Sequence, residues 1–98
     1  MLIHIATLNF DLTDKIRELV DTKLSQKLDR LLSSVDQALR VANVSIEKLP
    51  RSGYKIKFDM VLPPRHQIFA ENQHPVLTTA LTGLKEQIEK QLLRYKPQ

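Results

Sequence analysis

Two stretches of the chain place an apolar residue at every third or fourth position, the spacing that gives an amphipathic helix one buried face. The first begins after Thr13, a residue type that caps helices, and Asp14 adds a negative charge at the positive end of the helix dipole. The second is expected to begin near Pro75 and to end at Pro97. The expected buried positions are Ile16, Val20, Leu24, Leu28, Leu31 and Val35 in the first helix, and Leu77, Leu81, Leu84, Ile88, Leu92 and Tyr95 in the second.

Four other segments have the two-residue period of a strand. The first of them is partly apolar on both faces, whereas alternation in the others indicates one buried face. The four segments cover residues 2–7, 38–47, 54–62 and 67–71. A turn at 48–53 and the pair Pro63-Pro64 separate the last three of them. The sequence therefore predicts an α+β fold, a β-α-β-β-β-α two-layer sandwich in which two helices pack on one face of a four-stranded sheet.

Composition limits the chain to one small domain. Its 98 residues are enough for a single core, so we expect one domain over residues 1–98. The absence of cysteine excludes disulfides and thiolate metal sites. No apolar run is long enough to cross a bilayer, and we expect a cytoplasmic protein without a membrane partner. The formal net charge of +4 is a mild indication of an anionic partner.

The basic residues are grouped along both expected helices. An ideal helix turns by about 100° per residue, which aligns one row of them on a single flank of each apolar face, and in the first helix most acidic residues fall on the other side. The rows are Lys23, Lys27 and Arg30 in the first helix and Gly83, Gln87, Lys90 and Arg94 in the second. If the helices pack side by side, the two rows could line one groove and bind RNA phosphates.

The chain lacks the usual signatures of catalysis. Its histidines, His4, His66 and His74, are not at metal-ligand spacing, and the two glycines are too far apart to form a phosphate-binding loop. The aromatic residues Tyr54 and Phe58 fall on the expected buried face of their strand rather than on a base-stacking surface. We therefore expect neither an enzyme nor a protein with a cofactor, a metal or a small-molecule substrate.

Several stretches of the chain match motifs of one known protein family. They are Asn9-Phe10-Asp11-Leu12-Thr13, Ile16-Arg17-Glu18-Leu19-Val20 with Lys23-Leu24 and Lys27-Leu28-Asp29-Arg30, and Glu89-Lys90-Gln91-Leu92-Leu93-Arg94-Tyr95-Lys96. These stretches resemble the ribosome hibernation-promoting factor family, also called ribosome-associated inhibitor or ribosomal subunit interface protein, and the last is similar to the family's E-R-Q-L-x-K-Y-K. The resemblance covers nearly the whole chain, which is similar to the short form of the family.

The resemblance implies a domain that docks on the small ribosomal subunit, contacts its ribosomal RNA and blocks the messenger and transfer RNA sites, inhibiting translation in dormancy or stress. It also implies that the domain by which longer members pair ribosomes is missing after Lys96. We expect the protein to be a monomer off the ribosome. The RNA-binding residues expected from the family positions and the helix rows are Lys23, Lys27, Arg30, Gln87, Lys90 and Arg94.

The sequence also departs from the family pattern. Gln87 stands where a lysine is typical, and Val76-Leu77-Thr78-Thr79-Ala80 replaces the family's D-M-Y-A-A. One residue near Ser25-Gln26 looks inserted, which would rotate Lys27 and Arg30 relative to Lys23. Two other functions therefore stay open: a divergent module for structured RNA, and a protein-interaction domain with an acidic partner.

Overall fold

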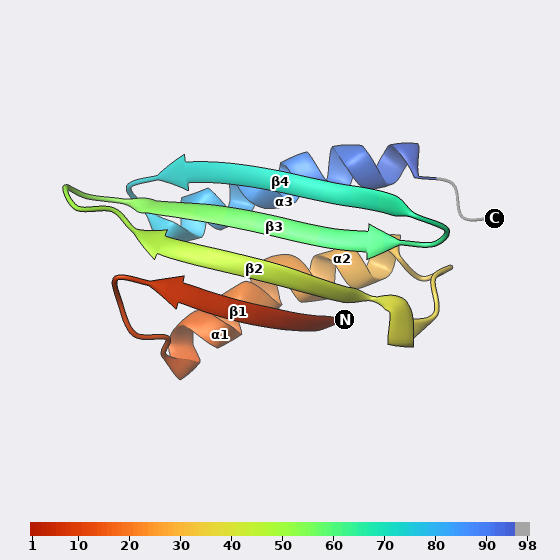
Figure 1. The fold of residues 1–98 in the computed structure, drawn as a ribbon, viewed down its shortest axis with the longest axis horizontal. Helices are drawn as coiled ribbons and strands as arrows, with labels where there is room; N and C mark the ends of the chain where they lie inside the picture. Colours follow the sequence, from red (N-terminus) through yellow and green to blue (C-terminus); the bar gives the residue numbers. More distant parts are fainter. Residues whose placement is uncertain (96–98) are drawn as a thin grey trace.

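The computed structural model describes residues 1–95 and has the expected order of elements (Figure 1). The first helix is one continuous rod in three parts, α1, a π-helical turn η1 and α2, and the second helix is α3. A short 3₁₀ turn, η2, precedes the second strand. The elements are β1 (Leu2–Leu8), α1 (Asp14–Val20), η1 (Asp21–Ser25), α2 (Gln26–Leu31), η2 (Gln37–Leu39), β2 (Val41–Lys48), β3 (Tyr54–Leu62), β4 (His66–His74) and α3 (Leu77–Arg94).

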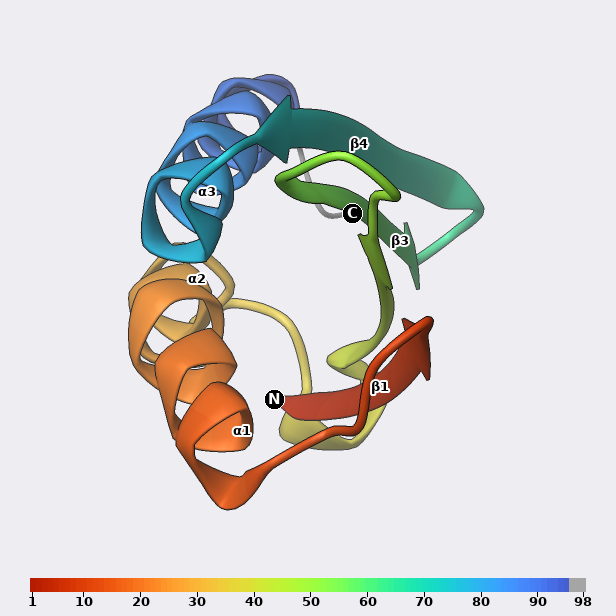
Figure 2. The ribbon, with the colours of Figure 1, turned by 90° about the vertical axis from the view of Figure 1, so that its left-hand side faces the viewer.

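The strands form one mixed sheet in the order β1-β2-β3-β4. β1 runs parallel to β2, with Ile5 beside Val44, while β2, β3 and β4 are antiparallel, with Phe58 beside Ala70. The α1–η1–α2 rod and α3 both lie on the same side of the sheet, and within residues 1–95 no layer covers the other face (Figure 2). This arrangement confirms the predicted α+β two-layer fold.

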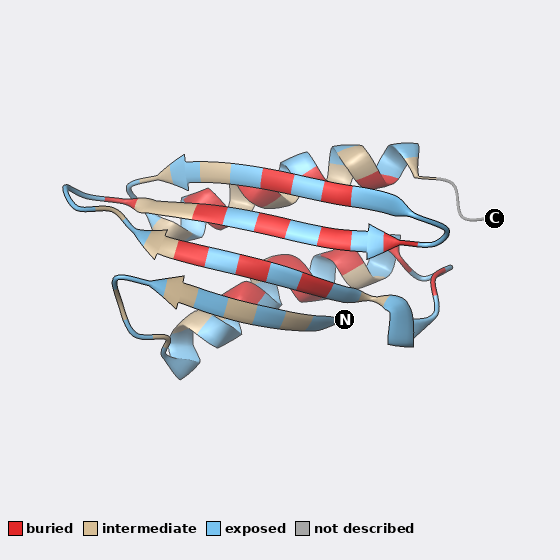
Figure 3. Cartoon of the chain, viewed as in Figure 1, coloured by how far each residue is buried: buried red, intermediate tan, exposed pale blue. Residues whose placement is uncertain are grey.

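The core lies between the sheet and the helices. Alternate residues of β2, β3 and β4 are buried, and the residues between them face outward (Figure 3). The largest fully buried side chains include Phe58, Ile46 and Ile56 from the strands and Leu24 and Ile88 from the helices. Burial of apolar side chains of this size stabilises a fold by about 1.5–3 kcal/mol each. The packing of the two layers is therefore the main source of stability.

The first helix begins as expected and then departs from α geometry. The Thr13 side chain accepts a hydrogen bond from the Ile16 amide at 3.2 Å, which caps the helix. Five residues later the backbone forms a π turn, in which the Gln26 N–H donates to the Asp21 carbonyl. A π turn holds an extra residue within an α-helix. It lies next to Ser25-Gln26, where comparison with the family pattern indicated one inserted residue.

The π turn changes which leucine enters the core. Leu32 is 1% exposed, whereas Leu31 is 44% exposed, so the predicted burial of Leu31 is wrong. The spacing from Ile16 would favour Leu31 on an uninterrupted α-helix. The extra residue turns the following segment back by about 100°, and this rotation brings Leu32 under the sheet instead.

Several boundaries also differ from the prediction. β2 starts at Val41 rather than residue 38, because the Asp36 side chain accepts a hydrogen bond from the Ala38 amide and starts η2. β4 extends from His66 to His74, well beyond the expected residues 67–71. Pro75 precedes α3, whose N-cap is Val76, and the helix ends at Arg94. Pro97 lies outside the described residues.

Candidate nucleic-acid interface

The excess of positive charge lies outside the sheet. The strands carry three basic residues, Lys48, Lys55 and Lys57, which are balanced by three acidic ones, Glu47, Asp59 and Glu71. The α1–η1–α2 rod and α3 carry eight basic and six acidic residues, so this layer has a net charge of +2. A polyanion would therefore be attracted to the helix layer more than to the sheet.

A groove between α2 and α3 brings two of the predicted RNA-binding residues together. It has a volume of about 240 Å³ and is lined by Lys27, Arg30 and Leu31 from α2 and by Glu89 and Leu93 from α3. The Glu89 carboxylate is 3.5 Å from the Lys85 ammonium group, one helical turn away. Lys85 therefore partly neutralises the only acid of this helix groove, which leaves a net positive charge at Lys27 and Arg30.

The π turn separates Lys23 from these two residues. Lys23 lies within η1 and is half-buried, whereas Lys27 and Arg30 follow the turn and are exposed. Lys23 does not line the helix groove. The structure thus divides the predicted first row into one half-buried residue and two exposed residues.

Gln87 faces the other side of α3, toward the sheet edge. Its side-chain carbonyl accepts from the Glu71 N–H at 3.4 Å, and its amide donates to the Glu71 carbonyl at 2.9 Å. Gln91, one turn later, makes the same pair of bonds with Phe69. These contacts put the Gln87 flank of α3 against β4, away from α2. The prediction that both rows line one groove is therefore wrong.

Gly83 allows a close contact between α3 and β4. A Cβ atom at Gly83 would lie 2.4 Å from Nδ2 of Asn72 on β4, and this nitrogen donates to the Ala80 carbonyl at 2.9 Å. The absence of a side chain at Gly83 thus lets α3 sit directly on β4. Gly83 and Gln87 therefore both contribute to the packing of α3 against β4, although Gln87 remains exposed.

Lys90 and Arg94 remain available to an external ligand. Both are exposed, and the helical period places Lys90 near the direction away from the sheet and Arg94 toward the β4 side. Within residues 1–95, no carboxylate lies within 4.0 Å of these two side chains or of Lys23, Lys27 and Arg30. The positive charges are thus spread over the outer surface of the helix layer, with Lys27 and Arg30 in the helix groove and Lys90 and Arg94 on α3.

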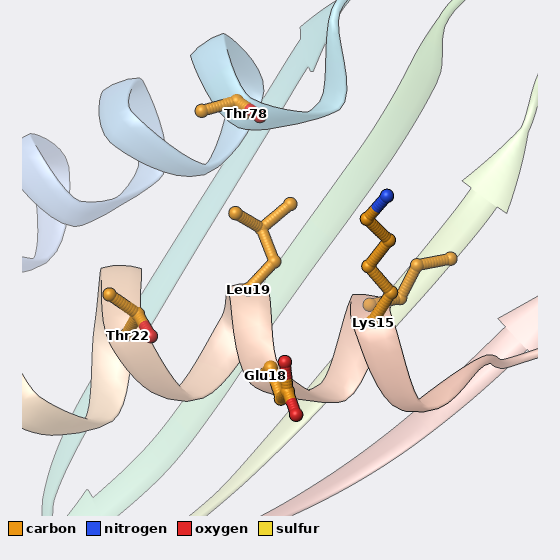
Figure 4. A pocket seen from close by; sticks show the side chains of 6 residues that line it. Lys15, Glu18, Leu19, Thr22 and Thr78 are labelled. Atoms are coloured by element: carbon orange, nitrogen blue, oxygen red, sulfur yellow. The ribbon is translucent and has the colours of Figure 1, made fainter.

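A second hollow opens where α1 diverges from the start of α3. It has a volume of about 450 Å³ and is lined by Lys15, Ile16, Glu18, Leu19, Thr22 and Thr78. Lys15 and Leu19 project from α1 toward the first turn of α3, which carries Thr78 (Figure 4). The hollow continues the line of the helix groove toward the other end of the layer.

Sequence reasoning missed two features of this surface. Gln91 was not recognised as a partner of β4, although its spacing of four from Gln87 places both amides on one flank of α3. Leu93 was not singled out either, yet it is 77% exposed beside Arg30 and Lys27. The position of Leu93 outside the expected apolar face of its helix could have indicated an exposed apolar residue at this surface.

Other kinds of site have no support in the part of the chain that the structure describes. Residues 1–95 contain no group of three or more His, Asp or Glu side chains that could hold a metal ion. The same residues include no helix that is long and apolar enough to span a membrane.

Solved structures of other proteins share this fold. The Thermus thermophilus Protein Y N-terminal domain is 24% identical, with a TM-score of 0.80, and the match covers 98% of this chain and 100% of that one. A ribosomal subunit interface protein from Coxiella burnetii is 17% identical, with a TM-score of 0.73 and 97% coverage of both chains. A search of curated proteins gave no significant match.

A family model provides the assignment that these fold similarities alone do not. The model described as sigma 54 modulation protein / S30EA ribosomal protein matches residues 3–98, nearly the whole chain. The description is that of a ribosomal protein rather than an enzyme, in agreement with the missing signatures of catalysis. It also confirms the resemblance that the sequence motifs indicated. The chain therefore belongs to the sigma 54 modulation protein / S30EA ribosomal protein family.

Proposed function

We propose that this protein is a ribosome hibernation factor of the cytoplasm. In this proposal the helix layer binds the small ribosomal subunit by contacting ribosomal RNA phosphates. The bound domain occupies the sites of messenger and transfer RNA and inhibits translation in dormancy or stress. Occupancy of the site is the whole mechanism, so no chemical step, cofactor or small-molecule substrate is needed.

The observation that carries the proposal is the set of unpaired cations on the helix layer. Lys27 and Arg30 in the helix groove and Lys90 and Arg94 on α3 have no carboxylate partner within residues 1–95. A cation held by a carboxylate would lose that partner on binding RNA, whereas these four would lose only water and counterions. Release of counterions from RNA makes such binding favourable and strongly dependent on salt.

The shape of the helix layer favours a structured RNA partner. The cations lie on the two packed helices, and the exposed aromatic residue of the sheet, Phe69, is on the opposite layer. A layer of this kind contacts backbone phosphates and reads RNA by shape, not by base stacking. Ribosomal RNA presents a fixed arrangement of phosphates that such a surface could match.

The proposal is tested by reversing the charge of the α3 pair. We expect Lys90→Glu with Arg94→Glu to weaken binding to isolated small subunits, and the slope of log affinity against log salt to fall by about one per lost phosphate contact. The same double change at Lys27 and Arg30 should act in the same way. Binding is measured by co-sedimentation at several salt concentrations, and competition with transfer RNA tests whether their sites overlap.

A matched control makes the same change of charge on the sheet. Lys48→Glu with Lys57→Glu alters two exposed residues of β2 and β3 and should leave the salt slope unchanged. Equal losses in both double variants would mean that only total charge matters, and unchanged co-sedimentation of the helix variants would refute the surface. If binding persists without transfer RNA competition, the target is another structured RNA region.

A further inference from the structure

The two edge strands of the sheet differ in the hydrogen bonding of their outward backbone groups. At the β4 edge, Gln87 and Gln91 of α3 bond to the N–H and C=O groups of Glu71 and Phe69. At the β1 edge, no hydrogen bond within residues 1–95 joins the outward backbone groups to another part of the protein. One edge is therefore closed to further strands, and the other is open.

The ladder between β1 and β2 identifies the open groups. Leu2 donates its N–H to the Arg40 carbonyl at 2.9 Å, so Leu2 faces β2. Backbone groups of successive residues point to opposite edges of a strand. The N–H and C=O groups of Ile3, Ile5 and Thr7 therefore point away from the sheet and can pair with a new strand.

β1 also lacks the features that usually keep an edge strand from pairing. Such features are lysine, proline, a bulge or a covering element. The seven residues Leu2–Leu8 contain no lysine and no proline, and they pair with β2 in unbroken register. The strand has no Asp, Glu, Lys or Arg, although the chain has a net charge of +4. A second copy could approach this edge without bringing like charges of the two strands together.

We propose that β1 pairs with β1 of a second copy of this chain, antiparallel and about a two-fold axis at Ile5. The pairing opposes Ile3 to Thr7 and Ile5 to its own copy, which allows about six backbone hydrogen bonds. It also opposes Leu2 to Leu8 on the outer face, where the non-hydrogen-bonded geometry brings side chains close. The two sheets become one continuous sheet of a symmetric dimer.

The side chains of β1 fit this pairing on both faces. Leu2 and Leu8 are 57% and 56% exposed at the two ends of the strand, so one copy would cover the leucines of the other. On the inner face, Ile3 and Ile5 are only half-buried, whereas the inward residues of β2 are fully buried (Figure 3). The core is thus incompletely covered on the side where the second copy would lie.

The interface is small, so the dimer is expected to be weak, and the monomer expected from the sequence should predominate at low concentration. A single strand pair buries less area than the roughly 1,200–2,000 Å² of stable protein interfaces. We expect a dissociation constant on the order of 0.1–1 mM. The dimer should therefore become detectable only at high protein concentration. The pairing leaves the cations of the helix layer uncovered, so the inference is independent of the proposed ribosome binding.

The test uses the outer-face leucines, whose replacement leaves the core intact. Leu2→Lys with Leu8→Lys places like charges opposite each other at both ends of the strand pair and should abolish the dimer. Leu2→Lys with Leu8→Glu places opposite charges there and should restore it. Sedimentation velocity measures the mass, which should rise with concentration from 11.3 kDa toward twice that value in the wild type and in the restored variant.

A control variant separates this edge from general surface hydrophobicity. Val61→Lys with Phe69→Lys removes two exposed apolar side chains from the outer faces of β3 and β4 and should leave the dimer unchanged. A wild-type protein that stays monomeric up to about 1 mM overturns the proposal. So does a dimer that survives the double lysine change, and so does a lysine–glutamate variant that stays monomeric while its circular dichroism spectrum remains native.

Discussion

Gln91 of α3 pairs with both backbone polar groups of Phe69 on the edge strand β4. Gln87 repeats the arrangement at Glu71, two residues further along the strand. The spacing works because four residues of helix rise by about 6 Å and two residues of strand by about 6.6 Å. Two side-chain amides thus occupy positions that a fifth strand would otherwise take.

Removing both glutamine side chains should open the β4 edge. We expect Gln87→Ala with Gln91→Ala to lower the free energy of unfolding by about 2–6 kcal/mol, since four hydrogen bonds are lost and each costs about 0.5–1.5 kcal/mol when water can replace it. The exposed edge should also increase aggregation. Urea denaturation and light scattering measure the two effects. Glu86→Ala, on the exposed side of α3, is the control and should be nearly neutral.

Gly83 and Asn72 should behave as a coupled pair. Alanine favours a helix over glycine by about 1 kcal/mol, but in the wild type a Cβ at Gly83 displaces the Asn72 amide from Ala80. Gly83→Ala should therefore stabilise the protein only in the Asn72→Ala background. A double-mutant cycle by urea denaturation measures the coupling, expected at about 1 kcal/mol. Equal effects in both backgrounds would show that the contact is unimportant.

Deletion of Gln26 should convert the π turn into ordinary α-helix. Gln26 is exposed, and within residues 1–95 its side chain forms a hydrogen bond only with the Asp21 carboxylate. Without it, Val20, Leu24, Leu28 and Leu32 follow one another at spacings of four, three and four, which an α-helix accommodates. We expect a folded protein of equal or greater stability by thermal denaturation.

A deletion in α3 provides the contrast. Removing Glu86 rotates one half of α3 relative to the other, because α3 contains no π turn whose extra residue could be lost. The rotation separates Gln87 and Gln91 from their partners on β4. We expect this variant to lose several kcal/mol or to fail to fold. Similar stability of the two deletion variants would argue against the role given to the π turn.

The two adjacent leucines at the end of the first helix should differ sharply on truncation. Leu32→Ala removes a fully buried side chain and should cost about 2–5 kcal/mol. Leu31→Ala removes a side chain at the rim of the helix groove and should change the free energy of unfolding by less than about 1 kcal/mol. Guanidinium denaturation of both variants measures the difference, and the reverse order would restore the simple helical prediction.

The sequence by itself determined the layers of this protein. Alternation in strands such as Tyr54–Leu62 and the apolar period from Leu81 to Ile88 identify which face each element buries, and two helices with four strands have few ways to bury those faces. The cap at Thr13 and the grouping of basic residues on the helices are also local properties. Motifs along the whole chain were sufficient to indicate the family.

Only the tertiary structure decided how the elements meet. The burial of Leu32 instead of Leu31 depends on one π turn. This turn lets the leucines before and after it pack into the same core. The role of Gln87 depends on the distance between α3 and the β4 edge, and the open edge at β1 depends on the strand order. These features arise from contacts between residues far apart in the chain. The periodicity of one segment does not reveal which distant residue its side chains will contact.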